Sequence, residues 1–225
     1  MLVARLAVRT CSTAPSFNGR CLCTLSHSAV CETSLSKFFI CVVYLGVGFP
    51  TLVKPWLDLA KYREARMREA LIEARLALEF LGGGLVRNAA GKAFQAWKAY
   101  LGALLADKRE YLKELHPGSR KIRVGEEEVV VEEADVVVAL VPTSHMARLA
   151  AVAGGDAVEG TAVVLHLHRY QRNGPDPEGL FSDIPDDRTA AVFICRLAGR
   201  IAPHDELYKR VCGALAPPTA GGSNV

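Results

Sequence analysis

The sequence predicts an all-α fold, an antiparallel bundle of helices with a short β-hairpin or irregular insertion near residues 120–141. Three observations support this class. Apolar residues make up 50% of the chain, enough for a core, whereas aromatic residues make up only 7%. Alanine is abundant in the middle and C-terminal parts. Apolar residues also recur at steps of three and four over long stretches, as they do on one face of a helix.

The first segment, residues 1–51, differs from the rest in composition. It carries the whole net charge of +3, so the remainder of the chain is balanced. It is poor in acids, as targeting sequences are, and it runs into 16 uncharged residues, 38–53, where a membrane-spanning helix needs roughly 20. We expect a low-order leader without stable membrane insertion. Two alternatives stay open: a weak membrane anchor, and a true start codon further downstream.

The cysteines predict neither a disulfide framework nor a metal site. Seven is an odd number, and only Cys195 and Cys212 lie outside the leader. The leader contains four side chains of zinc-binding type, Cys21, Cys23, His27 and Cys31. The single-residue gap within the first pair, and the lack of a second pair, do not fit a structural zinc site. We therefore expect no metal and no cofactor.

The body of the protein is predicted over residues 52–212 and begins with a long amphipathic helix. Pro55 and the candidate cap Asp58 precede its periodic region. Its predicted apolar stripe is Met67, Leu71, Ala74, Leu78 and Leu81. Gly82–Gly84 end this helix, and a second long helix starts at once.

The second helix has the apolar stripe Val86, Ala90, Ala93, Trp97, Tyr100 and Leu104. Small residues in its first half favour the close approach of another helix, and Trp97 fills the wider space beyond them. A short glycine connection between two long helices predicts an antiparallel helical hairpin. We expect this helix to extend to Leu115, where His116, Pro117 and Gly118 stop it.

Residues 119–141 are rich in valine, which favours strands. Gly125 and Glu126 suit the turn of a hairpin, but residues 132–140 equally suit a helix, and periodicity does not separate the two. Further helices are predicted at residues 144–154, capped by Thr143 or Ser144, at 157–173, and at 186–202. A proline-broken loop spans residues 175–185, and residues 213–225 form a disordered tail by composition.

Two groups of polar residues are candidates for ligand binding. The glycine run follows a helix and lacks the Gly-Lys-Ser/Thr ending of a phosphate-binding loop. The next helix still begins with free backbone N–H groups that can bind an anion, and it carries the first group, Arg87, Asn88 and Lys92. The second group lies near the end of the 157–173 helix and comprises His168, Gln171 and Asn173.

Residues 54–81, 84–105 and 168–179 resemble the archaeal PaREP family of paralogous proteins. The resemblance covers about residues 54–200 and falls on both candidate groups. It implies a helical fold similar to HEPN domains, and it implies a thermophilic archaeal source, which excludes organellar targeting by the leader. We expect a cytoplasmic protein. The resemblance implies no particular reaction.

Many HEPN proteins are metal-independent RNases that use an arginine and a histidine separated by four to six residues. Arg109 and His116 have this spacing and are the candidate catalytic pair; Arg20 and His27 repeat it in the leader. About 1.4 such pairs are expected by chance at this composition, so the motif is weak. Arg109 and His116 also fall at the end of the second helix, away from the usual motif position.

The sequence therefore favours a non-catalytic, HEPN-like binding module for nucleotide, RNA or a partner protein. We expect a homodimer that associates through an alanine-rich helix face. The balanced charge of the body counts against long nucleic acids. The alternatives are a metal-independent RNase and a toxin–antitoxin component whose partner is a neighbouring-gene protein.

Overall fold

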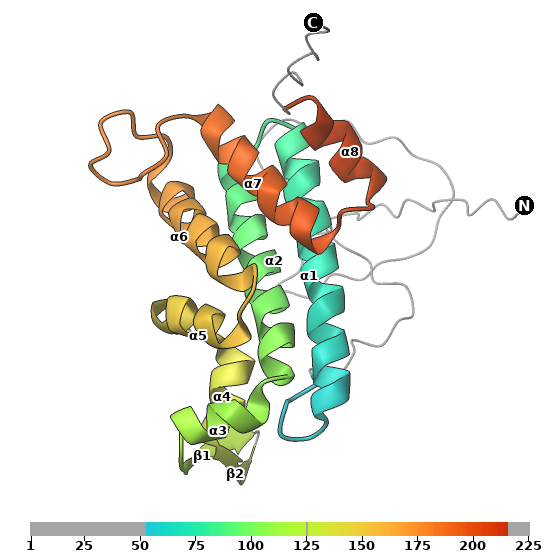
Figure 1. Ribbon diagram of the computed structural model, residues 1–225, viewed down its shortest axis with the longest axis vertical. Coiled ribbons are helices and arrows are strands. Elements are labelled where there is room, and N and C mark those ends of the chain that lie inside the picture. Colours follow the sequence, from blue (N-terminus) through green and yellow to red (C-terminus); the bar gives the residue numbers. More distant parts are fainter. Residues whose placement is uncertain (1–52, 125, 216–225) are drawn as a thin grey trace, which may run out of the picture. The chain divides into compact units, whose positions relative to one another are not determined.

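The computed structural model describes residues 53–124 and 126–215. Within these residues the chain forms eight α-helices, one 3-10 turn and a two-stranded antiparallel sheet (Figure 1), which confirms the all-α prediction with its hairpin. The helices are α1 (Leu59–Gly82), α2 (Val86–Ala106), α3 (Arg109–Leu115), α4 (Glu133–Leu140), α5 (Met146–Ala153), α6 (Ala157–Asn173), α7 (Asp187–Ile201) and α8 (Glu206–Gly213). The strands are β1 (Ser119–Val124) and β2 (Glu127–Glu132).

The predicted leader, with its cysteines and the Arg20–His27 pair, lies outside the described residues. The same holds for the hairpin residue at position 125 and for residues 216–225 of the predicted tail.

Helices α1 and α2 form the predicted antiparallel hairpin (Figure 1). Asp58 caps the start of α1 by accepting a hydrogen bond from the Lys61 N–H at 2.9 Å. At the other end, the Leu85 N–H donates to the Phe80 carbonyl and the Gly84 N–H to the Leu81 carbonyl. These two bonds, with Gly84 at φ +76°, make a Schellman motif. The glycines therefore form a helix-ending turn.

The buried stripe of α1 differs from the predicted one. The side chains that face α2 and the core are Tyr62, Ala70, Ala74, Ala77 and Leu78. Leu71, predicted to be in the core, is 41% exposed, and Ile72 beside it is 61% exposed. Closely packed helices leave room for small side chains at their contact, so alanines occupy the interface and the larger residues turn outward.

Helix α2 is buried over more of its circumference than a single apolar stripe would cover. Ala89, Ala90 and Ala93 are at most 3% exposed because other parts of the same chain cover them. This face of α2 is therefore not available to carry the predicted dimer, and the dimer itself stays a prediction. The face belongs to the core.

The Trp97 side chain fills the contact between α2 and α6. Its ring is fully buried, and its indole N–H donates to the Thr161 hydroxyl at 2.9 Å. A Cβ added to Gly160 would lie 2.1 Å from the ring, so only glycine fits beneath it. The sequence predicted a wider space at Trp97, but here α6 approaches α2 so closely that it carries a glycine against the ring.

The second predicted helix ends earlier than expected. α2 stops at Ala106, and the short helix α3 follows after Asp107 and Lys108. Asp107 instead forms an ion pair with Arg63 of α1 at 2.9 Å. This break lets the chain turn toward the β-hairpin.

Residues 119–141 contain both of the structures between which the sequence did not choose. β1 and β2 pair antiparallel with Ser119 opposite Glu132, and α4 begins directly after β2. α4 packs against α2 and α3, and the Tyr62 hydroxyl of α1 donates to the Val138 carbonyl at 2.8 Å. Burial of that hydroxyl raises the pKa of Tyr62 to about 12.

The C-terminal part corrects two predictions. Cys195 of α7 and Cys212 of α8 form a disulfide, although the cysteine count predicted none. α8 itself was not predicted, and it runs through the boundary placed at residue 212. Before α5, Thr143 and Ser144 form a 3-10 turn without a side-chain cap bond, so neither is the predicted cap.

Candidate functional site

Four of the six predicted ligand-binding residues line one surface groove between α1, α2 and α6. They are Arg87, Asn88, Lys92 and Gln171, and the groove is completed by Phe80, Gly91 and Gln95. We call this the polar groove; its volume is about 610 Å³. The first candidate group thus meets Gln171 of the second, some eighty positions away in sequence, whereas His168 and Asn173 do not line the groove.

Arg87 joins the start of α2 to the end of α6. Its Nη2 donates to the carbonyls of Gln171 at 3.0 Å and Arg172 at 2.6 Å, and its Nε also donates to Gln171. These carbonyls lack helical partners, and a cation at a helix C-terminus is favoured by the helix dipole. Arg87 therefore holds the wall of the polar groove, while its Nη1 stays outside these bonds.

Gly91 allows Gln171 to lie across α2. A Cβ at this position would meet the Gln171 amide nitrogen at 2.7 Å. Because any larger residue would push the amide away, Gly91 sets the position of Gln171 in the groove.

Lys92 is paired with a carboxylate of α1. Its Nζ lies 2.9 Å from Oε2 of Glu73, and both side chains are partly buried. The pair links α1 to α2 at the base of the polar groove. The Lys92 ammonium therefore offers the groove a hydrogen-bond donor in a fixed position, while Glu73 neutralises its charge.

His168 lies on α6, and its ring stacks on Phe94 of α2 with centroids 4.2 Å apart. Its Nδ1 is buried and has no hydrogen-bond partner among the described residues. Burial lowers the pKa of His168, and the charges of Arg172 and Lys98 lower it further, while a hydrogen bond with Gln171 opposes them. The imidazole is therefore neutral near pH 7, as its unperturbed pKa of roughly 6.5 is shifted downward.

Gln95 and Lys98 extend the polar face of α2 beyond the predicted residues. Asn88, Lys92, Gln95 and Lys98 follow one another at helical steps of four and three. Lys98 is half-buried, and burial with the nearby charge of Arg66 lowers its pKa. The sequence reasoning missed both residues, although the same spacing that marks apolar stripes could have found them.

Three cations in and around the polar groove have no carboxylate partner in the described part of the chain. They are Arg87, Lys98 and Arg172, whereas the neighbouring Glu69 and Glu73 are paired with Arg66 and Lys92. The groove therefore combines exposed amide groups with unneutralised positive charge. Such an arrangement suits an anionic ligand.

The geometry is that of one compact binding surface, and the comparison with known families covers all of it. The model of the archaeal PaREP1/PaREP8 family matches residues 65–195, more than half of the chain. The chain belongs to this family. No curated protein and no solved structure matches the chain.

In this PaREP-family chain, Asn173 does not line the polar groove. Its amide donates to the Phe181 carbonyl at 2.8 Å and holds the loop between α6 and α7. The sequence placed it correctly at the end of α6, but its side chain turns toward the loop.

The candidate catalytic pair lies on α3 and its C-cap, on elements that do not line the polar groove. Every guanidinium nitrogen of Arg109 is engaged: Nε and Nη2 with the buried Asp135 at 2.5 and 2.7 Å, Nη2 also with Glu132, and Nη1 with Glu110. These bonds raise the pKa of Arg109 further. His116 follows as the α3 C-cap, with its Nε2 buried and without a partner in the described residues. Arg109 thus serves the fold and is not poised to hold a phosphate.

The described residues contain neither a cluster of metal-binding side chains nor a single membrane-spanning helix. No group of three His, Cys, Asp or Glu side chains there could hold a metal ion. No single helix in that part of the chain is long and apolar enough to cross a membrane. Residues 133–140 and 143–153 together have the length and apolar composition of a span, but the chain bends by 101° between them.

Proposed function

We propose that this PaREP-family chain is a non-catalytic, HEPN-like binding module whose polar groove binds a nucleotide or a similar small phosphorylated ligand. One observation carries the proposal. The amides of Asn88, Gln95 and Gln171 lie on the same surface as cations without carboxylate partners.

The residue types fit the two halves of a nucleotide. Asn and Gln side chains donate and accept hydrogen bonds together, so they match the polar edge of a base. Lys98 and Arg172 flank His168 and supply charge for a phosphate. The neutral His168 ring, supported from below by Phe94, offers a flat surface for stacking.

The balance of charge favours a small ligand over a long nucleic acid. The residues after position 51 have no net charge, so the cations of the polar groove are a local feature. Proteins that track a nucleic-acid backbone carry an extended basic face. The RNase alternative needs Arg109 to bind a phosphate, and the ion pair of Arg109 with Asp135 counts against that role.

Calorimetric titration with ATP and with inorganic tripolyphosphate tests the proposal. We expect ATP to bind more tightly than tripolyphosphate, because only ATP uses the amides. Gln95→Ala and Lys98→Met should each weaken ATP binding roughly tenfold or more, the effect of losing one hydrogen bond to a charged group or one charged partner. Lys121→Ala on the exposed β-hairpin is the matched control and should bind as the wild type does.

Equal affinity of the wild type and both groove variants would contradict the site, and absence of binding would contradict the ligand class. Incubation with structured RNA in EDTA tests the non-catalytic part. Cleavage that disappears in His116→Ala would establish the RNase alternative instead.

A further inference from the structure

The loop between α6 and α7, residues 174–186, is held in one conformation by its own polar groups. The Asp176 carboxylate accepts hydrogen bonds from the backbone N–H groups of Gly179, Phe181 and Ser182. These bonds lower the pKa of Asp176, the Phe181 N–H contributing most. At the base of the loop, Ile184 is fully buried and its carbonyl accepts from the Asp176 N–H. The loop is therefore anchored at its base and braced at its tip.

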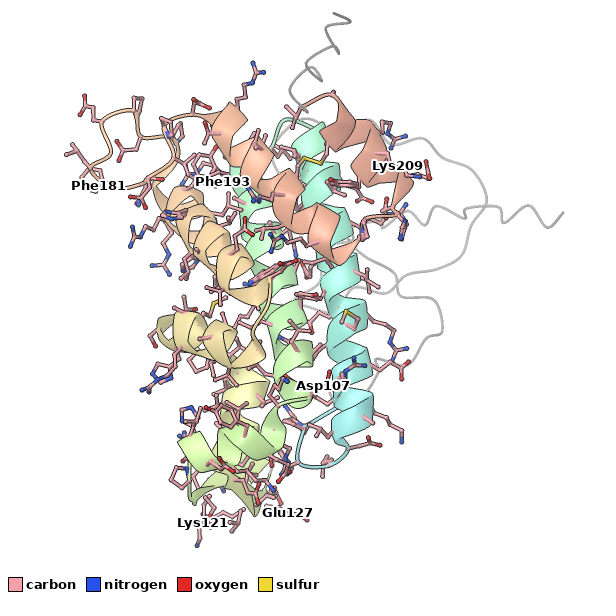
Figure 2. The ribbon with its side chains drawn as sticks, in the orientation of Figure 1. Asp107, Lys121, Glu127, Phe181, Phe193 and Lys209 are labelled. Atoms are coloured by element: carbon pink, nitrogen blue, oxygen red, sulfur yellow. A yellow bond between two sulfur atoms is a disulfide. The ribbon has the colours of Figure 1, made fainter. Side chains whose placement is uncertain are left out.

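The braced tip presents two large apolar side chains to solvent. Leu180 is 69% exposed and Phe181 is 71% exposed, and Figure 2 shows Phe181 pointing outward from the loop. Exposing two adjacent apolar side chains on a rigid support costs free energy that a partner surface would recover. No lysine or arginine lies among residues 174–187, whereas five acidic residues do. Asp183 is paired with His166 and Arg169, but Glu178, two residues before Leu180, is exposed and forms no ion pair within the described residues.

A matching concave surface lies elsewhere on the same chain. We call it the apolar groove; it lies between α1, α7 and α8 and has a volume of about 700 Å³. Its apolar lining includes Leu78, Leu81, Ala191, Leu207 and Val211. Arg210 also lines it and forms no ion pair within the described residues, whereas Glu79 is paired with Arg75. The groove thus offers apolar surface and one free positive charge.

We propose that the chain forms a symmetric dimer in which the Leu180–Phe181 tip of each copy enters the apolar groove of the other. The apolar tip matches the apolar lining, and the exposed Glu178 carboxylate beside the tip matches Arg210. Both surfaces lie toward the end of the α1–α2 hairpin that holds the Gly82–Gly84 turn (Figure 1). A two-fold axis at this end lets both contacts form at once, which closes the assembly at two chains.

This interface replaces the buried alanine-rich face that the sequence suggested. It is independent of the polar groove, none of whose lining residues it uses. Failure of ligand binding and failure of dimerisation are therefore separate outcomes.

Sedimentation analysis of the full chain, with its disulfide intact, tests the dimer. We expect the wild type to be dimeric at micromolar concentration. The double variant Leu180→Ser/Phe181→Ser should weaken association on the order of 100-fold, as expected for central apolar anchors, and Arg210→Glu should weaken it about tenfold or more. Leu140→Ser removes another largely exposed leucine, outside both surfaces, and should leave the dimer unchanged. Since all the replaced side chains are exposed, each variant should keep the fold of the single chain, which its far-UV circular dichroism spectrum checks. Its melting temperature should fall only by the stabilisation that dimerisation gives the wild type.

Mixing the two interface variants tests the reciprocal geometry. A chain with Leu180→Ser/Phe181→Ser keeps its groove, and a chain with Arg210→Glu keeps its tip, so a mixed dimer regains one intact contact. We expect the mixture to associate more tightly than either variant alone. A monomeric wild type, including one whose own residues 216–225 fill the groove, overturns the proposal. So does a dimer that survives both variants.

Discussion

At the scale of single residues, two neighbouring glycines in one turn have different requirements. Gly84 has φ +76°, in the left-handed region that disfavours any side chain, whereas Gly83 has φ −87°. Both belong to the turn that orients α1 against α2 and brings Phe80 and Arg87 to the polar groove. The sequence shows three glycines but not which of them is obligatory.

Gly84→Ala should therefore destabilise the protein by about 1 kcal/mol, the cost of placing a Cβ in the left-handed region. Gly83→Ala is the matched control. Its added Cβ would meet only backbone oxygens at an ordinary 3.6 Å, and the loss of freedom in the unfolded chain should make it neutral or stabilising by up to about 1 kcal/mol. Urea unfolding measures both. Equal effects of the two substitutions would show that the left-handed conformation is not what constrains this turn.

At the scale of helices, sequence periodicity correctly predicted where most helices lie but not always which face they bury. In α1 the larger residues Leu71 and Ile72 face outward, because the close contact with α2 admits alanine instead. Apolar periodicity predicts burial of the most hydrophobic side chains. A close contact between two helices instead requires small side chains at the interface. The same limit explains why Gln95 and Lys98 were not predicted. They belong to a polar stripe on α2 that has the period of a helix, but a search for apolar periodicity does not detect it.

Helix α8 depends on a bond that the cysteine count did not reveal. Cys212 of α8 is joined to Cys195 of α7, and around them Leu78 and Ala198 form a small separate core. Pairing could not be deduced from spacing, and α8 itself was not predicted.

We expect the variant Cys195→Ser/Cys212→Ser to lose about 3 kcal/mol of stability, the contribution of a loop of this length. α8 should then detach before the rest of the chain, because it packs mainly on α1 and α7. Limited proteolysis between α7 and α8, together with thermal melting, measures both effects. A reductant should shift the melting temperature of the wild type but not of the double variant. Unchanged protease resistance would show that packing alone holds α8.

At the scale of the whole described domain, the two proposed binding surfaces and the structural ion pairs lie in separate regions. The polar groove, the acidic loop and the apolar groove gather around α1, α2, α6, α7 and α8, whereas the β-hairpin, α3 and α4 form a cap held by ion pairs. The sequence predicted two clusters at helix ends, and the fold brings all of the first and Gln171 of the second into one groove. It could not show that Arg109 belongs to the cap, since Asp135 lies 26 positions further along, on another helix.

The ion pair between Arg109 and Asp135 should contribute strongly to the stability of the cap. Asp135 is 2% exposed and receives two bonds from Arg109, so Arg109→Leu would leave a carboxylate buried without its counter-charge. Such a loss costs about 3–5 kcal/mol, whereas replacing both partners by apolar residues is often neutral. Arg109→Leu should therefore unfold at much lower urea concentration, and Arg109→Leu/Asp135→Leu should recover most of the difference.

Arg120→Leu is the control for this pair, because the ion pair of Arg120 with Glu133 is more exposed and should contribute no more than about 1 kcal/mol. At temperatures where Arg109→Leu is still folded, we expect it to bind ATP as the wild type does, since none of the residues lining the polar groove contacts Arg109. A catalytic Arg109 predicts the opposite pattern, with wild-type stability and a lost activity. Unfolding and binding measured on the same sample therefore distinguish the arginine of a structural ion pair from that of an active site.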